Sequence, residues 1–198
     1  MCNHYRNDPE AIKTIQSWKE YIGWSLDDEL PETASDVYPK RQGMVVRQEG
    51  DRKFVDAMHW GFPWVGKGKR EGATKKMNTT NVRNLASPLF RGIIDQPEQR
   101  CLVPFNQFAE PKLNAGREEV WFKVNEQPVS CFAGIWRKQD EGKCYAFLTC
   151  EPNPLVKAIH PKAMPVILQP EDYDSWLAGD DATEFQAPFP SQLLSIVE

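Results

Sequence analysis

The segment Arg100-Cys101-Leu102-Val103-Pro104-Phe105-Asn106-Gln107-Phe108-Ala109-Glu110 decides the fold class, because it begins as a buried strand and ends on a carboxylate. Further strands are predicted at residues 120–124, 129–136 and 145–150. Many short strands with a few helices, and no repeating strand–helix alternation, indicate an α+β protein. We expect a mainly antiparallel, barrel-like sheet with a few flanking helices.

The rest of the chain supplies the outer elements of this sheet. Residues 43–47 and 54–61 predict a hairpin around the turn at residues 49–51. Strands are also predicted at residues 165–168 and 193–197. Helices are predicted at residues 8–24 with Asp8 as N-cap, at residues 153–160 with Asn153 as N-cap, and at residues 171–177.

Length and composition are typical of one globular domain. The chain has 198 residues, 40% hydrophobic and 26% charged, which predicts a single domain over residues 1–198. The motifs described below occupy residues 2–168, and an acidic tail begins at residue 178. No apolar run reaches the roughly 18 residues of a membrane span, and no signal peptide is evident. We therefore expect no membrane partner, a monomer, and a cytoplasmic location (at the nucleoid in a bacterium, nuclear in a eukaryote).

The cysteines argue against a disulfide framework and against a metal site. There are five of them, and no pair has C-x-x-C spacing. We expect no metal and no cofactor. Cys101, Cys131, Cys144 and Cys150 lie in apolar strand-like contexts and are interpreted as buried packing residues. Cys2 differs because it follows Met1 at the chain end.

Cys2 becomes the first residue once Met1 is removed, by an aminopeptidase or by the protein itself. Its α-amine and thiol would then stand on adjacent carbons, and their ordinary pKa values near roughly 8 and 8.5 leave both usable at neutral pH. Such a pair condenses with an aldehyde to an imine, which the sulfur closes to a thiazolidine ring. The alternative is an unstructured chain end with a chance cysteine.

A basic stretch at residues 67–76 stands out against the net charge of −4. It contains Lys67, Lys69 and Arg70, and Trp64 precedes it. Aromatic faces that stack on bases, beside cations that follow phosphates, are the two parts of a single-strand binding groove. A solvated basic loop is the alternative interpretation.

Two further side chains could act together with Cys2. Glu110 ends the fold-deciding strand, and His160 ends a predicted helix just before a proline. A nucleophile, a carboxylate and a histidine are what covalent catalysis with acid–base help requires. The sequence does not show that they meet, and a helix-end histidine can merely interact with the helix dipole.

Five motifs in order resemble those of the SOS-response-associated peptidase (SRAP) family, also called abasic-site processing proteins. They are Met1-Cys2, Trp60-Gly61-Phe62-Pro63-Trp64, Asn81-Val82-Arg83, the segment 100–110, and His160-Pro161-Lys162-Ala163-Met164-Pro165. The departures from the family pattern are Asn3-His4 in place of Gly-Arg, Asn84-Leu85 in place of an acidic residue, Gln107 in place of Gly, Pro111 in place of Trp, and Lys162 as an approximate match for Arg.

The resemblance implies covalent capture of abasic sites in single-stranded DNA, which is the expected partner. It implies catalytic roles for Cys2, Asn81, Glu110 and His160: Glu110 would hold or deprotonate the Cys2 amine, His160 would move protons at the sugar, and Asn81 would position the amine and sugar. DNA contacts are implied or expected for Arg6, Trp64, Lys67, Lys69, Arg70, Arg83 and Lys162. The peptidase in the family name implies self-removal of Met1, and a lyase activity is a further expectation.

Two other classes of function stay open at this stage. A cysteine peptidase or amidase would use the thiol of Cys2 with His160 and would not need the free amine. A non-catalytic single-strand-binding module would bind intact and abasic strands equally, with base stacking and phosphate contacts alone.

Overall fold

Strands dominate the computed structural model, which describes residues 2–8, 11, 13–15, 17–18, 30–70, 73–113, 115–140 and 142–197. The larger sheet has the order β13 (Met164–Pro165), β12 (Gly142–Cys150), β4 (Arg52–Trp60), β3 (Gln42–Glu49), β8 (Arg100–Phe105), β11 (Ser130–Gln139) and β14 (Ile167–Leu168), with β7 (Asn81–Val82) beside β12. Because β12 also pairs with β11, the strands β12, β4, β3, β8 and β11 close into a barrel. The mainly antiparallel, barrel-like sheet predicted from the sequence is confirmed.

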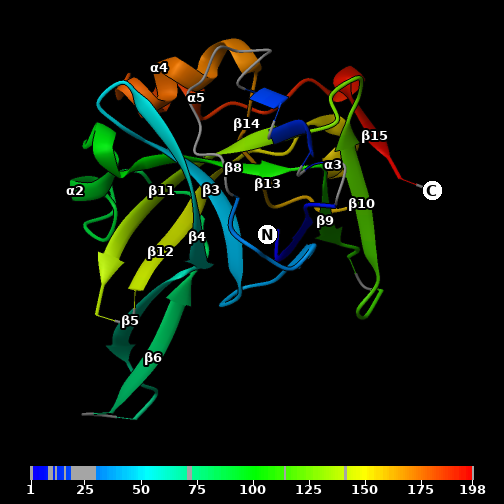
Figure 1. Cartoon of the computed structure of the whole chain (residues 1–198). Coiled ribbons are helices and arrows are strands. Elements are labelled where there is room, and N and C mark those ends of the chain that lie inside the picture. The colour runs from blue at the N-terminus through cyan, green and yellow to red at the C-terminus, as the bar shows by residue number, and fades with distance from the viewer. Residues whose placement is uncertain are drawn as a thin grey trace.

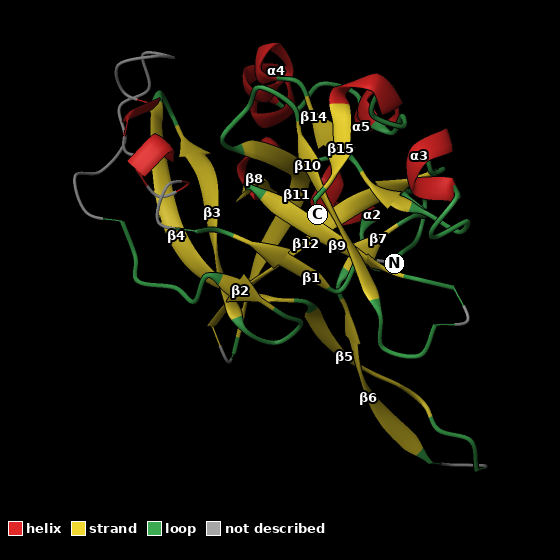
Figure 2. Cartoon of the chain, turned by 90° about the vertical axis from the view of Figure 1, so that its right-hand side faces the viewer, coloured by secondary structure: helices red, strands yellow, loops and turns green. Residues whose placement is uncertain are grey.

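A second sheet packs beside the barrel and carries the N-terminal strand. Its order is β15 (Leu194–Ile196), β10 (Glu119–Val124), β9 (Gln107–Pro111), β1 (His4–Arg6) and β2 (Asp36–Val37), all antiparallel (Figure 2). The fold-deciding segment forms β8 in the barrel and β9 in this second sheet, and changes sheet at Asn106. One continuous segment therefore joins the two sheets.

Stacked aromatic side chains fill the space between the sheets. The ring centroids of Phe105 and Phe132 lie 3.9 Å apart, and those of Phe132 and Phe147 lie 4.6 Å apart. Tyr5 of β1 packs edge-on against Trp60 at 5.3 Å. All five side chains are fully buried. Since burying one such side chain stabilises a fold by roughly 1.5–3 kcal/mol, these contacts fix β1 to the barrel.

The helices are short and lie around the sheets (Figure 1). They are α2 (Arg91–Ile94), α3 (Pro154–Lys157), α4 (Tyr173–Ala178) and α5 (Ala182–Phe185), with 3-10 turns η1 (Pro97–Gln99), η2 (Pro170–Asp172) and η3 (Ser191–Leu193). Asn153 caps α3 as predicted, because its side chain accepts a hydrogen bond from Val156 N at 2.9 Å. None of the helices in the described part of the chain is long and apolar enough to cross a membrane.

The predicted helix at residues 8–24 is described only in part. Residues 11, 13–15, 17 and 18 are helical, and Asp8 accepts a hydrogen bond from Ala11 N at 2.9 Å, as its predicted N-cap role requires. Residues 9, 10, 12, 16 and 19–24 of this prediction lie outside the described residues.

A two-stranded arm projects from the body of the protein (Figures 1 and 2). It consists of β5 (Phe62–Lys67) and β6 (Thr74–Thr79), with Trp64 directly opposite Met77. The basic stretch 67–76 is therefore in part a hairpin, because Lys67 ends β5 and residues 74–76 lie in β6, whereas Lys69 and Arg70 lie in the connection between the two strands. Its strand character was hidden by the many charged residues, and the paired Trp64 and Met77 side chains hold the two strands together.

Candidate active site at the N-terminal strand

Cys2 lies inside the protein, immediately before β1. Tyr5, three residues later, is anchored in the aromatic core, and its hydroxyl is hydrogen-bonded to that of Tyr145. The Cys2 side chain is fully buried, and its thiol lies 3.5 Å from the carbonyl oxygen of His4, to which it donates. An unstructured chain end, the alternative left open by the sequence, is wrong.

Glu110 reaches the same place from β9. Ala109 pairs with His4, so Glu110 stands beside the residues that precede β1. Its side chain is fully buried, and burial raises the pKa of this carboxyl to about 7. The negative charge of Glu110 is also a cause of the raised pKa of Cys2, which places the two groups within electrostatic reach of each other.

His160 enters the site from the turn that follows α3. Its Nε2 lies 3.9 Å from Oε2 of Glu110. The backbone N–H of Leu113 donates to the carbonyl oxygen of Ile159 at 3.3 Å, which ties this turn to the chain leaving β9. Burial lowers the pKa of His160, and the positive charge of Lys162 contributes in the same direction. The imidazole is therefore neutral at neutral pH and can either accept or donate a proton.

Asn81 completes the group from the first position of β7. Its Nδ2 donates to the carbonyl oxygen of Cys2 at 3.2 Å and contacts Thr80 Oγ1 at 2.7 Å. Asn81 is 8% exposed. The structure thus brings together Cys2, Asn81, Glu110 and His160, which are remote in sequence and come from four different elements.

The thiol of Cys2 is less acidic than its ordinary value suggests. Burial raises its pKa well above the usual range, and the negative charge of Glu110 raises it further. These two effects favour the protonated thiol in this conformation. Ring closure at Cys2 would require a base to take the thiol proton.

The family model described as "SOS response associated peptidase (SRAP)" matches residues 1–197. The chain belongs to the SRAP family. A solved structure from Bordetella bronchiseptica is 25% identical, with full coverage of both chains and a TM-score of 0.73. One from Bacteroides thetaiotaomicron is 21% identical over 100% of this chain and 92% of its own, also with a TM-score of 0.73. A phage-related protein from B. bronchiseptica has 17% identity, coverage of 99% and 92%, and a TM-score of 0.63. No curated protein matches the chain.

The two arginines that border this SRAP site already have acidic partners. Arg6 Nε lies 2.7 Å from Asp36 Oδ1, and its guanidinium stacks 3.8 Å above the Trp121 ring. Arg83 forms an ion pair with Glu151. Lys162 is exposed beside His160, and no carboxylate lies within ion-pair distance of it among the described residues. Of these three predicted DNA contacts, only Lys162 offers an unshared charge.

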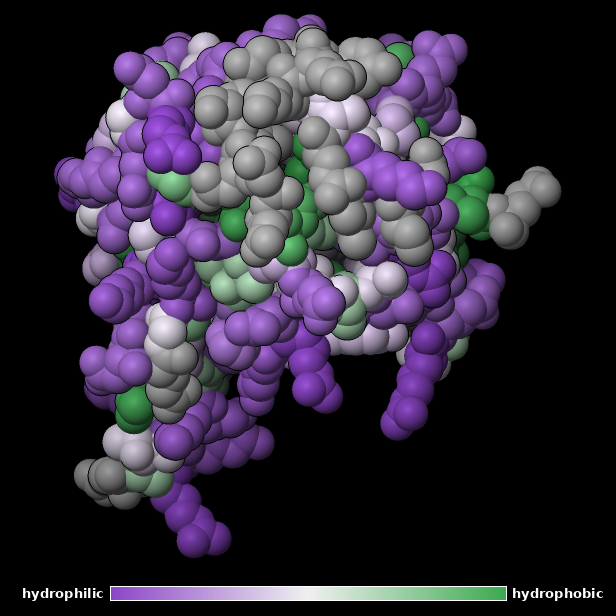
Figure 3. Space-filling view, viewed as in Figure 1, coloured by the Kyte–Doolittle hydropathy of each residue, from purple (hydrophilic) through white to green (hydrophobic). Residues whose placement is uncertain are grey.

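The arm of this SRAP protein carries the remaining predicted DNA contacts. Trp64 is 37% exposed, and its Nε1 donates to Thr79 Oγ1 at 2.9 Å. Lys67, Lys69 and Arg70 are partly or fully exposed, and none has an ion-pair partner within the described ranges. Figure 3 shows hydrophilic side chains on the arm interspersed with hydrophobic ones, and Val65 and Met77 of the arm are exposed. The structure places these residues away from Cys2.

A cavity of about 380 Å³ lies at the base of the arm. Lys40, His59, Lys76 and Asn78 line it. The sequence analysis missed Lys40 and His59, because they precede the basic stretch and only the fold brings them beside it. Lys76 belongs to that stretch and could have been singled out by its charge.

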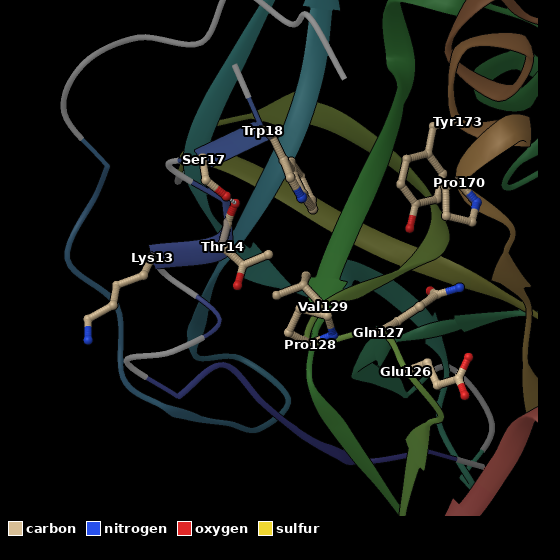
Figure 4. A pocket seen from close by; sticks show the side chains of 10 residues that line it. All are labelled: Lys13, Thr14, Ser17, Trp18, Glu126, Gln127, Pro128, Val129, Pro170 and Tyr173. Carbon is tan, nitrogen blue, oxygen red and sulfur yellow. Dashed lines mark hydrogen bonds between the residues drawn. The ribbon is translucent and has the colours of Figure 1, made fainter. Parts of the chain in front are cut away.

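A separate cavity of about 510 Å³ lies between the N-terminal helical residues and the turn that joins β10 to β11. Figure 4 shows Trp18 and Tyr173 on two of its sides, with Val129 and Pro128 between them. None of the four site residues lines it. Within the described residues there is no group of three or more His, Cys, Asp or Glu suited to a metal ion.

Proposed function

We propose that this protein captures the ring-opened aldehyde of an abasic site in single-stranded DNA on the amine and thiol of Cys2. The observation that carries the proposal is the convergence of Cys2, Asn81, Glu110 and His160 in one buried place, with Glu110 3.9 Å from His160 and Asn81 bonded to the Cys2 carbonyl. The proposal begins with removal of Met1, by the protein itself or by an aminopeptidase, which frees the α-amine.

The first step is formation of an imine. The amine nitrogen attacks the aldehyde carbon, and the resulting hydroxyl leaves as water when a proton reaches it. Glu110 takes the surplus proton from the amine, since its raised pKa of about 7 lets it act as a base at neutral pH and give a proton back. His160, held close to Glu110, supplies the proton to the leaving oxygen.

The second step closes the ring. The sulfur of Cys2 adds to the imine carbon, the thiol proton leaves the sulfur, and the former imine nitrogen ends with one proton. Because the pKa of the thiol is raised, this proton transfer needs the ionised Glu110 as a nearby acceptor. Over both steps one water is lost, and the product is a thiazolidine that joins the protein to the sugar. Proton transfer at His160 would open the sugar to the aldehyde. The expected lyase activity would need a further step from the imine, in which a base takes a proton from the carbon next to the imine carbon, a carbon–carbon double bond forms, and the phosphate on the following carbon leaves.

The same features weigh against an ordinary cysteine peptidase. Such an enzyme needs a thiol whose pKa is lowered, usually by a paired histidine. Here burial and Glu110 raise the pKa of Cys2, and the imidazole of His160 lies 3.9 Å from the carboxyl of Glu110. The peptidase named in the family description is assigned in this proposal to removal of Met1.

DNA binding is assigned to the arm and to Lys162. Exposed aromatic and cationic side chains without acidic partners can contact bases and phosphates at little desolvation cost. The arm leads directly into the site, because β6 ends at Thr79 and Asn81 follows after Thr80. A strand lying along the arm would thus reach Cys2.

The test is intact mass spectrometry of the purified protein mixed with a single-stranded oligonucleotide that carries one abasic site. The expected species lacks Met1, contains the DNA, has lost one water and survives denaturation. An oligonucleotide with a reduced, alcohol-form abasic site is the control and should give no adduct. Non-covalent binding of equal strength to intact and abasic strands, without any adduct, would support a plain single-strand-binding module instead.

A further inference from the structure

His4 is a buried side chain held between two partly exposed carboxylates. Its Nδ1 lies 2.9 Å from Glu119 Oε2, and its Nε2 lies 2.8 Å from Asp36 Oδ1. The ring stacks on Tyr38 with centroids 3.9 Å apart and meets the edge of Trp121 at 4.4 Å. His4 is only 4% exposed.

This arrangement defines the protonation state of the ring. A neutral imidazole has one N–H and one lone pair, and the lone pair would face a carboxylate oxygen without a proton between them. Only the imidazolium donates from both nitrogens. Arg6, which also contacts Asp36, adds a second positive charge, so two cations balance Asp36 and Glu119. The hydrogen bonds from Arg6 and His4 lower the pKa of Asp36, which keeps it ionised.

The two carboxylates come from residues that are not the ladder partner of His4. His4 pairs with Ala109 of β9, whereas Asp36 of β2 pairs with Arg6, and Glu119 belongs to β10, which does not pair with β1. Strand β1 has three residues and so makes few ladder hydrogen bonds. The side chain of His4 therefore supplies a second, charged attachment for a very short strand.

The carbonyl oxygen of the same residue accepts the hydrogen bond from the thiol of Cys2 at 3.5 Å. Any displacement of His4 moves this acceptor and the backbone that leads to Cys2. The family pattern has an arginine at this position, whereas His4 here has both nitrogens engaged inside the protein. Position 4 in this chain thus offers no charge to a phosphate.

We propose that His4, as an imidazolium clamped by Asp36 and Glu119, is a positioning residue that fixes β1 and thereby aims Cys2 at the aldehyde. The inference rests on the proposed function for its catalytic consequence. Without this clamp, Cys2 should be held less firmly.

The experiment compares wild-type protein with His4→Gln, which keeps polarity but cannot carry a charge. The rate of covalent capture at saturating abasic strand and the affinity for an intact strand are both measured. We expect capture by His4→Gln to be about tenfold slower than by wild type, with the affinity unchanged, because the charged hydrogen bonds to both carboxylates are lost. The control, Lys112→Gln, removes an ion pair with Glu118 in the adjacent β9–β10 connection and should change neither quantity.

A capture rate in His4→Gln equal to that of wild type would overturn the proposal. Glu119→Gln provides a second test if His4→Gln does not fold, and it should slow capture in the same way. The double variant should lose less than the two single losses combined, because both changes break the same clamp. Amide hydrogen exchange of Tyr5 and Arg6 is measured alongside and should speed up in both variants. If wild type forms no adduct, the proposed function fails, while the exchange data still decide whether the clamp exists.

Discussion

The N-terminal strand and the β5–β6 arm contain the same kinds of residue in opposite settings. At β1, the aromatic side chain of Tyr5 is fully buried, and His4 and Arg6 are bound to carboxylates. On the arm, Trp64 is 37% exposed, and Lys67 and Lys69 have no ion pair within the described part of the chain. Charge serves to fix geometry in the first region and is available to a partner in the second.

This difference follows from what each region is proposed to do. Bond formation at Cys2 needs reacting groups held within a fraction of an ångström, which burial and paired charges provide. Binding a flexible polyanion needs exposed charge whose desolvation costs little. The four predictions below test whether the two roles are separate, beginning with the largest expected effect.

Replacing Cys2 by Ser should abolish the heat-stable adduct and leave binding of an intact strand unchanged. An alcohol does not close a stable ring on the imine, and the arm is untouched by the change. Denaturing gel electrophoresis measures the adduct, and fluorescence anisotropy measures binding. Heat-stable adduct in the Ser variant at wild-type yield would show that the chemistry does not require the sulfur.

Glu110→Gln should slow capture by about 10²–10⁴-fold, the usual contribution of a positioned acid–base group. In wild type the rate should rise as the pH passes about 7, because the raised pKa of Glu110 makes its base form dominant only above that value. The variant should lack this rise. Glu118→Gln, on an exposed residue of the neighbouring turn, is the control and should retain it. A variant profile that still rises near the same pH would assign the titration to another group.

Replacing Lys67, Lys69 and Arg70 together by Ala should weaken non-covalent binding and flatten its dependence on salt. The slope of log K against log salt should fall by about 2, since each phosphate contact to a single strand contributes about 0.7. Capture at saturating strand should keep its rate. Lys112→Ala, which removes an ion-paired cation, should leave the slope as it is. An unaltered slope in the triple variant would mean that the arm is ordinary solvated surface.

Trp64→Ala should have the smallest effect, a loss of about 1–3 kcal/mol in binding if one base stacks on the indole. Trp64→Phe keeps an aromatic face and should lose less. Thermal unfolding should change little in either variant, because the side chain is partly exposed on the arm. Equal losses for Ala and Phe would argue that the indole N–H bond to Thr79, rather than stacking, is what matters.

Much of the fold was predictable because its strands have local signals. The segment 100–110 has an apolar run long enough for two strands, and Asn153-Pro154 is a plain helix start that the structure confirms. The pairing of β11 with β12, which closes the barrel, could not be predicted from the sequence. It depends on contacts between segments far apart, which no local pattern encodes.

The four residues of the candidate site were found through their chemistry and family motifs, and their convergence came only from the fold. Cys2 looks like a loose end in the sequence, whereas the burial of Tyr5 draws it inside. The acidic partners of Arg6 and Arg83 were not predicted either. Asp36 and Glu151 lie 30 and 68 positions away from them, and ion pairs at such separations leave no trace in spacing.

The joint between the arm and the site limits how this protein can vary in evolution. Successive side chains of a strand point to opposite faces, so one residue inserted between Thr79 and Asn81 would turn the Asn81 amide away from the Cys2 carbonyl. Changes of length at the tip of the hairpin, beyond Lys67, do not pass through this joint. The length and the charge of the arm can therefore change to suit different DNA strands without disturbing the site. The link at Thr80, in contrast, has to stay one residue long.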